Sequence, residues 1–328
     1  MEKIDVKKEA LEAEERIRPH IRETPLEFSL PLSQVTDSEV FLKLENLQFS
    51  GSFKFRGAIN KVLSLENEKI KKGLVTASSG NHGVAFAHIL RKLGLKGTIF
   101  LPENASPTKI EVLRSFGVDL RLHETDCART EAFARKTAES TGQEYISPYN
   151  DVKVVGGQAT IGIELERQAE RIDAVFVPVG GGSLIGGIAG YLKVKNKGIE
   201  IVGCQPENSP VMYESLKAGK IIEMESKPTL SDGTFGGIEE GSITFDLCRD
   251  YVDDFVLVKE EEIEEAIKFF LEKQHMLIEG AAALSVASFL KTKKKYRGKR
   301  VILIISGSKI PLDKLRMILC KVGEKKRD

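Results

Sequence analysis

Short apolar runs alternate with helix-like runs along most of the chain, and this pattern constrains the fold more than any other feature. From residue 73 onward, each short apolar run is followed by a segment whose apolar residues recur at helical spacing. Residues 174–179 are apolar throughout, as in a strand that is buried on both faces. Strands that alternate with helices form parallel sheets with helices on both faces. The sequence therefore predicts an α/β fold with mostly parallel sheets covered by helices.

The same periodicity predicts the individual elements. The first helix is expected over residues 6–21, with Leu11, Ile17 and Ile21 on its apolar face. Strands are expected at residues 40–45, 74–77, 98–101, 118–122, 144–146, 174–179, 200–204, 255–258 and 301–305. Further helices are expected at residues 55–62, 81–93, 107–116, 125–140, 155–169, 209–218, 261–274, 279–290 and 312–319. Residues 227–241 form a long loop without periodicity, and loops of this length are often functional.

Composition and charge exclude several classes of protein. The formal net charge is +1, so neither a nucleic-acid-binding surface nor an acidic tail is indicated. No apolar run approaches the ~20 residues that span a bilayer, and the amino terminus has no apolar signal core. The cysteines lack the spacing of metal ligands or of a disulfide framework: Cys127, Cys204, Cys248 and Cys320. We therefore expect a protein of the reducing cytoplasm, without nucleic-acid or membrane partners.

One lysine stands between two aromatic residues in the segment SGSFKFRGA at residues 50–58. Lysine in water is protonated, with a pKa near ~10.4. Beside Phe53 and Phe55, Lys54 could be desolvated, and its amine could then form an imine with an aldehyde. The alternative is an ordinary exposed lysine, which is the commoner state of this residue type.

Residues 78–83 have the sequence SSGNHG and lie between a predicted strand and a predicted helix. Small residues here let backbone N–H groups face a ligand, and the amino end of a helix favours an anion such as a carboxylate. The alternative is an ordinary helix cap by Ser79 or Asn81. The segment therefore indicates either a carboxylate site or a plain helix start.

Three consecutive glycines, Gly180, Gly181 and Gly182, follow the most strand-like run of the chain. Their amides could wrap a phosphate at the start of the next helix. A dinucleotide site is disfavoured because the G-x-G-x-x-G spacing fails at Ile185, and the next strand ends at Gln205 without an acidic residue to hold a ribose. A single phosphate fits this loop better than a pyrophosphate, and a tight turn is the remaining alternative.

The last predicted strand ends at Ser306 and Gly307. A hydroxyl here could meet a ring nitrogen, although a serine after a strand is more often only a turn residue. In α/β sheets, ligands collect at the carboxyl ends of the strands, and each of these loops lies at such an end. This coincidence of position favours a common site.

In this order, the motifs resemble the fold-type II enzymes that use pyridoxal phosphate (PLP), in the branch of threonine and serine dehydratases and serine racemase. The resemblance covers nearly the whole chain and rests on FK and RGA at residues 53–58, SSGNHG at 78–83, the glycine loop before Leu184, SDG at 231–233 and SG at 306–307. It implies a large PLP-binding domain of residues 1–72 and 150–328 and a small domain of residues 73–149 that carries the substrate-carboxylate loop. It also implies a homodimer or homotetramer.

The resemblance implies a role for each candidate residue. Lys54 would hold the cofactor as a Schiff base and then take the α-proton of the substrate, which Ser79 would face from the opposite side. Phe53 would pack on the cofactor ring, Asn81 would bond its phenolic oxygen, and Ser306 would lie at its ring nitrogen. The phosphate would be held by the amides of Gly180, Gly181, Gly182, Ser183 and Leu184. The substrate would be held by Ser78, Ser79, Gly80, Asn81 and His82 at its carboxylate and by Gly236 near its amine.

The activity implied by the resemblance is that of an ammonia-lyase converting β-hydroxy amino acids such as L-threonine and L-serine to 2-oxo acids and ammonia. A serine racemase on the same scaffold is the alternative, in which Ser79 protonates the opposite face. A nicotinamide-dependent oxidoreductase and a non-catalytic protein that keeps the fold are the more remote alternatives. The chain departs from the family pattern at Ser183 and at residues 308–309. The divalent-metal ligands of serine racemase fall on Gln205 and Val211 here, so no metal is expected.

Overall fold

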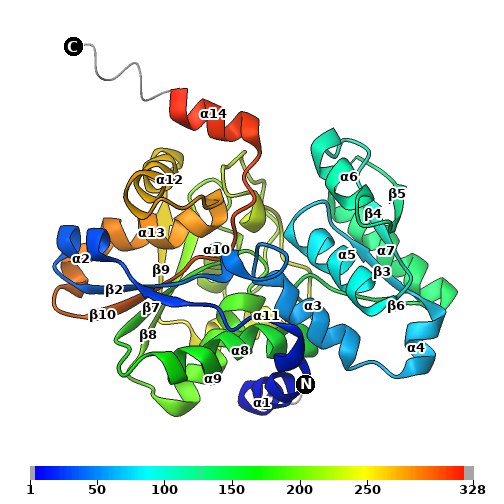
Figure 1. Cartoon of the computed structure of the whole chain (residues 1–328), viewed down its shortest axis with the longest axis horizontal. Helices are drawn as coiled ribbons and strands as arrows, with labels where there is room; N and C mark the ends of the chain where they lie inside the picture. Colours follow the sequence, from blue (N-terminus) through cyan, green and yellow to red (C-terminus); the bar gives the residue numbers. More distant parts are fainter. Residues whose placement is uncertain (1–3, 126, 321–328) are drawn as a thin grey trace.

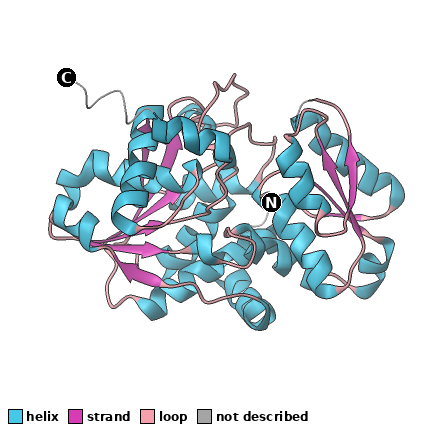
Figure 2. Ribbon diagram, turned by 45° about the horizontal axis from the view of Figure 1, so that its top comes forward, coloured by secondary structure: helices cyan, strands magenta, loops and turns pink. Residues whose placement is uncertain are grey.

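The structure is a computed structural model that describes residues 4–125 and 127–320. Its strands form two sheets, which Figure 2 shows as separate groups. The larger sheet has the order β1-β2-β10-β7-β8-β9, and only its pair β1–β2 is antiparallel. Its strands are β1 (Leu26–Phe28), β2 (Glu39–Lys43), β7 (Ala174–Pro178), β8 (Glu200–Pro206), β9 (Asp254–Val258) and β10 (Arg300–Ile304).

The smaller sheet has the order β5-β4-β3-β6 and is parallel throughout. Its strands are β3 (Leu74–Ala77), β4 (Gly97–Leu101), β5 (Asp119–Leu122) and β6 (Glu144–Tyr145). Its helices are α5 (Asn81–Leu93), α6 (Pro107–Arg114) and α7 (Cys127–Thr141). We call this sheet with its helices the small unit. Figure 1 shows it on the right of the molecule.

The remaining helices accompany the larger sheet or join it to the small unit. They are α1 (Val6–Ile17), α2 (Leu30–Thr36), α3 (Lys54–Leu63), α4 (Asn67–Lys72), α8 (Val152–Gln168), α9 (Ser183–Lys195), α10 (Val211–Ala218), α11 (Ile243–Tyr251), α12 (Glu260–Gln274), α13 (Gly280–Thr292) and α14 (Leu312–Cys320). Single 3-10 turns lie at Arg18–His20, Glu45–Leu47, Asp232–Thr234 and Lys293–Tyr296. Helix α3 lies between the two sheets and packs against both α8 and α5 (Figure 1).

Strand β7 shows how the core is divided between the two faces of the larger sheet. All of its residues are buried. Val175 and Val177 belong to the core cluster shared with α8 and α9, whereas Ala174 and Phe176 belong to the cluster shared with α12 and α13. Successive side chains of a strand point to opposite faces, so the helices on both faces bury the whole strand. The α/β class with mostly parallel, helix-covered sheets is therefore confirmed.

Helix α1 is shorter than predicted and presents a different face. It ends at Ile17, just before Pro19, and a 3-10 turn continues the chain. Leu11 is 46% exposed, so the prediction that it lies on the apolar face was wrong. The buried positions are Val6, Ala10, Ala13 and Ile17. Small alanines on this face let α1 approach α8 closely, and a Cβ at Gly156 would lie 2.9 Å from the carbonyl oxygen of Glu9.

Three short helices were not predicted from periodicity. These are α2, α4 and α11, of 7, 6 and 9 residues. Helices α2 and α4 contain too few turns to give a periodic signal, whereas α11 has as many residues as α14, which was predicted. Within residues 4–125 and 127–320, no helix combines the length and the apolar character needed to cross a bilayer.

Candidate active site

Lys54 is the first residue of α3, and its amine donates a hydrogen bond to the carbonyl oxygen of Pro148 at 2.7 Å. Burial lowers the pKa of Lys54 to about 8, although Glu131 and Glu279 oppose the shift. The Phe53 ring lies beside the amine, with its centroid 5.1 Å from Nζ. At this pKa about a tenth of the amine is neutral at pH 7, and the neutral amine is the form that attacks an aldehyde.

The segment that carries Lys54 is joined to the end of β10. The Phe53 N–H donates to the Ser306 carbonyl oxygen at 3.1 Å, and Ser52 forms an antiparallel bridge with Gly307. Ser306 is 2% exposed, and its hydroxyl has no hydrogen-bond partner among the described residues. Leaving a buried hydroxyl unpaired costs about 1–3 kcal/mol, so a ligand atom that bonds Ser306 would stabilise the site.

Asn81 reaches from the start of α5 to Glu279, at the start of α13. The amide nitrogen of Asn81 donates to both carboxylate oxygens of Glu279, at 2.8 and 2.9 Å. The Asn81 side-chain oxygen is buried without a partner in the described part of the chain. Burial raises the pKa of Glu279, although the hydrogen bond from Asn81 opposes the shift. This contact joins the small unit to the larger sheet next to Lys54.

Glu279 is the site residue that the sequence analysis missed. The pattern indicated only a helix starting near residue 279, and an acidic residue at a helix start is an ordinary capping choice. The structure instead buries the side chain to 5% exposure. A Cβ on Gly307 would lie 2.6 Å from a Glu279 carboxylate oxygen, so glycine is required there. The signal that could have revealed this residue is a lone acidic side chain within an otherwise apolar stretch.

The glycine loop joins β7 to α9 and has no room for side chains. A Cβ on Gly180 would lie 2.9 Å from the Thr234 Cα, and a Cβ on Gly181 would lie 2.4 Å from the Tyr149 ring. Gly182 has φ of +85°, which disfavours other residues, and α9 begins at Ser183 without a side-chain cap. The first N–H groups of a helix have no intrahelical partner. The loop therefore presents bare backbone donors suited to a phosphate.

The segment 78–83 turns from β3 into α5, and no side chain caps that helix. The Gly80 N–H donates to the Ser78 hydroxyl oxygen at 3.2 Å, which fixes the turn. A Cβ on Gly83 would lie 2.0 Å from the Ser78 carbonyl oxygen, so the helix can start this close to the strand only at glycine. Ser79 is half-buried in this turn. The amino end of α5 thus presents backbone N–H groups, as a carboxylate requires.

His82 is the second residue of α5, and its imidazole bonds to residues other than those of the turn at 78–81. Its Nε2 lies 3.0 Å from both the Ile146 carbonyl oxygen and the Thr76 hydroxyl. Because the Thr76 hydroxyl also donates to the Ile146 oxygen, Nε2 carries the proton and donates. Burial, with a contribution from Lys54, lowers the pKa of His82 to about 3. The imidazole is therefore neutral, and only the backbone N–H of His82 is left for a substrate carboxylate.

Open space lies beside two of the predicted substrate contacts. A Cβ on Gly236, which has φ of +114°, would meet no atom within 4 Å. A Cβ on Gly80 would meet only the Ser78 hydroxyl, at 3.9 Å. A side-chain carbon could therefore be added at both places without a clash among the described residues.

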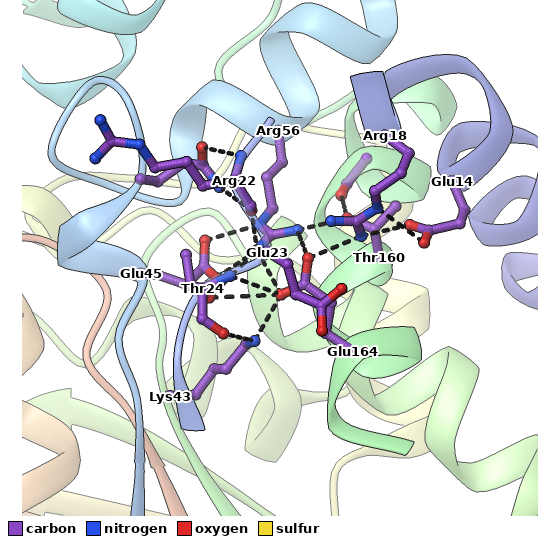
Figure 3. Close-up of polar contacts among 12 residues, drawn as sticks. Glu14, Arg18, Arg22, Glu23, Thr24, Lys43, Glu45, Arg56, Thr160 and Glu164 are labelled. Carbon is purple, nitrogen blue, oxygen red and sulfur yellow. Dashed lines mark hydrogen bonds and ion pairs between the residues drawn. The ribbon is translucent and has the colours of Figure 1, made fainter. Parts of the chain in front are cut away.

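A buried group of charges surrounds Arg56, two residues after Lys54 (Figure 3). We call Lys43, Glu45, Arg56 and Glu164 the buried ion cluster, because all four side chains have 0% exposure. Arg56 is 2.7 Å from both Glu45 and Glu164, and Lys43 is 2.5 Å from Glu164. Burial alone would raise the pKa of Glu164, but Arg56 and Lys43 lower it to about 2. The cluster therefore holds two positive and two negative charges in balance and fixes the first turn of α3.

The residues present fit PLP. The glycine loop fits its phosphate, the unpaired hydroxyl of Ser306 fits its ring nitrogen, and Lys54 fits its aldehyde. The Asn81 side chain, whose amide oxygen has no partner among the described residues, could bond its phenolic oxygen. In the part of the chain that the structure describes, no group of three or more His, Cys, Asp or Glu side chains could hold a metal ion.

Comparisons with known proteins agree with this geometry. The family model described as "Pyridoxal-phosphate dependent enzyme" matches residues 17–307. The chain is 40% identical to an L-threonine ammonia-lyase of Thermotoga maritima, over 94% of this chain and 77% of that protein.

Solved structures give the same result. The processed form of threonine deaminase isoform 2 from Solanum lycopersicum superposes with a TM-score of 0.92 at 30% identity, covering 97% of this chain and 88% of that one. Maize serine racemase superposes with a TM-score of 0.90 at 31% identity, covering 99% and 100%. The fold class and the cofactor predicted from the sequence are confirmed. The chain belongs to the pyridoxal-phosphate dependent enzyme family.

Proposed function

We propose that the chain is a PLP-dependent ammonia-lyase that converts L-threonine and L-serine to 2-oxo acids and ammonia. The observation that carries the proposal is its similarity, over 94% of its length, to the threonine ammonia-lyase of Thermotoga maritima. The site geometry supports the same reaction class. Family membership gives the nicotinamide-dependent and non-catalytic alternatives no support.

The site geometry supports a role for each residue that would hold the cofactor. The amides of Gly180, Gly181, Gly182, Ser183 and Leu184 would hold its phosphate. Ser306 would donate to its ring nitrogen, the Asn81 side chain would bond its phenolic oxygen, and Phe53 would pack against its ring. The bound cofactor supplies an aldehyde for the substrate amine and a ring that delocalises negative charge from the α-carbon.

The chain supplies binding and proton transfer. The amino end of α5, at residues 78–82, holds the substrate carboxylate, and Gly236 lies beside its amine. The desolvated amine of Lys54 takes the α-proton, because an amine with a pKa of about 8 is a competent base near neutral pH. The β-hydroxyl leaves with a proton as one molecule of water. Hydrolysis of the resulting imine to the 2-oxo acid and ammonia then consumes one molecule of water. L-threonine thus gives 2-oxobutanoate and ammonia in a balanced reaction.

The test is release of 2-oxo acid from L-threonine, L-serine and larger β-hydroxy amino acids, with and without added PLP. We expect turnover of threonine or serine by the wild type and its loss in Lys54→Ala. Borohydride reduction followed by peptide mapping should label residue 54. A wild type that binds PLP yet releases no 2-oxo acid would refute the lyase assignment, and an unlabelled residue 54 would refute the role of Lys54.

Racemisation is a second candidate, because maize serine racemase superposes on 99% of this chain. In that case Ser79 would protonate the face opposite Lys54. Chiral analysis after incubation with L-serine separates the two activities. If D-serine forms faster than pyruvate, racemisation is the main activity of the protein.

The organisation of the chain is also a proposal. We propose a large domain of residues 1–72 and 150–328 and a small domain of residues 73–149, supported by the separate six- and four-stranded sheets. We further propose a homodimer or homotetramer in the cytoplasm, and the free cysteines Cys204, Cys248 and Cys320 are consistent with that reducing compartment. Light scattering coupled to gel filtration tests the oligomer, and a monomer at assay concentrations would refute it.

A further inference from the structure

The loop of residues 227–241, which we call the site loop, lies over the candidate active site. A Cβ on Gly180 would lie 2.9 Å from the Thr234 Cα and 3.3 Å from the Gly233 carbonyl oxygen. The site loop therefore touches the glycine loop directly. Two residues after Thr234, the site loop reaches Gly236, beside which no atom lies within 4 Å of a built Cβ. The site loop thus borders the glycine loop at Thr234 and open space at Gly236.

Two ion pairs join the site loop to the small unit. Near its end, Glu239 lies 2.8 Å from Arg135 of α7, with the two side chains 29% and 30% exposed. Near its middle, Asp232 lies 3.7 Å from Lys109 of α6, although its nearer partner is Lys314 of α14, at 2.5 Å. The pair of Arg135 with Glu239 is therefore the stronger of the two links between the loop and the small unit.

The Arg135–Glu239 pair is also connected to the environment of Lys54. The Glu239 N–H donates to the Tyr149 hydroxyl at 2.9 Å, and the Tyr149 ring lies against Gly181. The residue before Tyr149 is Pro148, whose carbonyl oxygen accepts the hydrogen bond from Lys54. A displacement of Glu239 would therefore shift Tyr149, which contacts the glycine loop, and the neighbouring Pro148, which bonds Lys54.

We propose that Arg135 and Glu239 are positioning residues for the reaction: their ion pair holds the site loop, with Gly236, against the small unit and so keeps the substrate side of the site closed. This inference rests on the proposed function. Neither side chain takes part in chemistry. Both act through the site loop, by raising the fraction of molecules in which both walls of the substrate site are in place.

The expected effect follows from that fraction. Apparent affinity falls in proportion to the population of the binding-competent form, while turnover of the bound complex is unchanged. A partly exposed ion pair is weak enough to open on each catalytic cycle, and its loss should shift affinity by about two- to fivefold. Its contribution should also decrease as ionic strength rises.

The test uses the PLP-loaded enzyme, with 2-oxo acid release measured against L-threonine concentration. The variants are Arg135→Gln, Glu239→Gln, the double variant, and Arg135→Lys as the charge-conserving form. We expect each single variant to raise KM by about two- to fivefold with kcat within about twofold. The double variant should show no further rise over Arg135→Gln, because that change already removes the pair with Glu239 together with the longer pair, at 3.6 Å, with Glu131 of α7. Arg135→Lys should recover most of the loss, and added NaCl should raise KM more in the wild type than in the double variant.

The control is Arg121→Gln, which removes an exposed ion pair with Asp119 in the edge strand β5 of the same unit. Hydrogen exchange of the site loop, measured by mass spectrometry, provides a readout that is independent of activity. It should quicken in Arg135→Gln and in Glu239→Gln but not in the control. Unchanged KM and unchanged exchange in these two variants, with an active wild type, would overturn the inference. Additive effects in the double variant would overturn it as well. An inactive wild type with normal loop exchange would instead refute the proposed function.

Discussion

The buried ion cluster and the Arg135–Glu239 pair both join distant segments through opposite charges, yet they differ in their contact with water. The four side chains of the cluster are fully buried, and Arg56 alone donates to Glu45, Glu164 and Thr160. Arg135 and Glu239 each keep nearly a third of their surface in solvent. Charges removed from water must be paired whenever the protein is folded, whereas a half-exposed pair can separate at little cost. The first arrangement therefore suits a fixed helix start, and the second suits a loop that must open.

The largest expected effect tests this difference directly. Arg56→Ala should lower the free energy of unfolding by about 3–5 kcal/mol, because it leaves Glu45 and Glu164 buried without their partner. The matched change Arg135→Ala should lower it by less than about 1 kcal/mol. Urea unfolding of the cofactor-free proteins measures both values. Equal losses would show that burial does not distinguish the two arrangements.

An intermediate effect is expected for Lys54, which is buried with a carbonyl oxygen as its hydrogen-bond partner. Its pKa of about 8 lies below that of the unfolded chain. Between these values the unfolded state binds more protons at this group, so the contribution of Lys54 to stability increases as pH rises from 8 towards 10. Between pH 8 and pH 10 the change should reach about 2 kcal/mol, given the shift from 10.5 to about 8. The quantity to measure is the difference in unfolding free energy between the cofactor-free wild type and Lys54→Met at several pH values. A difference that does not vary with pH would mean that the amine is solvated.

The smallest effect on stability is expected for Ser306. Its hydroxyl is buried but uncharged, so it extends the comparison of buried and exposed charges to a neutral group. Its hydroxyl has no partner among the described residues, so Ser306→Ala should remove the cost of that unpaired group and raise the stability of the cofactor-free protein by about 1 kcal/mol. The same change should weaken PLP binding by about three- to tenfold. Spectroscopic titration with PLP measures the affinity. If Ser306→Ala binds PLP as tightly as the wild type does, then Ser306 does not bond the ring nitrogen of the cofactor.

Local patterns in the sequence were sufficient for much of the fold and of the candidate site. The glycine loop and the SSGNHG turn are each a short run of small residues after an apolar strand, and their chemistry is contained in consecutive positions. Strand order was not predictable, because periodicity does not show that β10 lies between β2 and β7. The partners of Arg56 come from three separate segments, so nothing near residue 56 indicates them. Glu279 was missed for the same reason, because its role depends on Asn81.

The position of β10 has a consequence for synthesis of the protein. Strand β2 pairs in parallel only with β10, and Ser52 and Phe53 are held by residues 306 and 307. A nascent chain that has not yet emerged past residue 307 therefore lacks both the centre of its larger sheet and the support for its reactive lysine. We therefore expect the cofactor to bind only after nearly the whole chain has been translated. A ribosome-stalled fragment that ends before β10 should remain colourless in the presence of the cofactor.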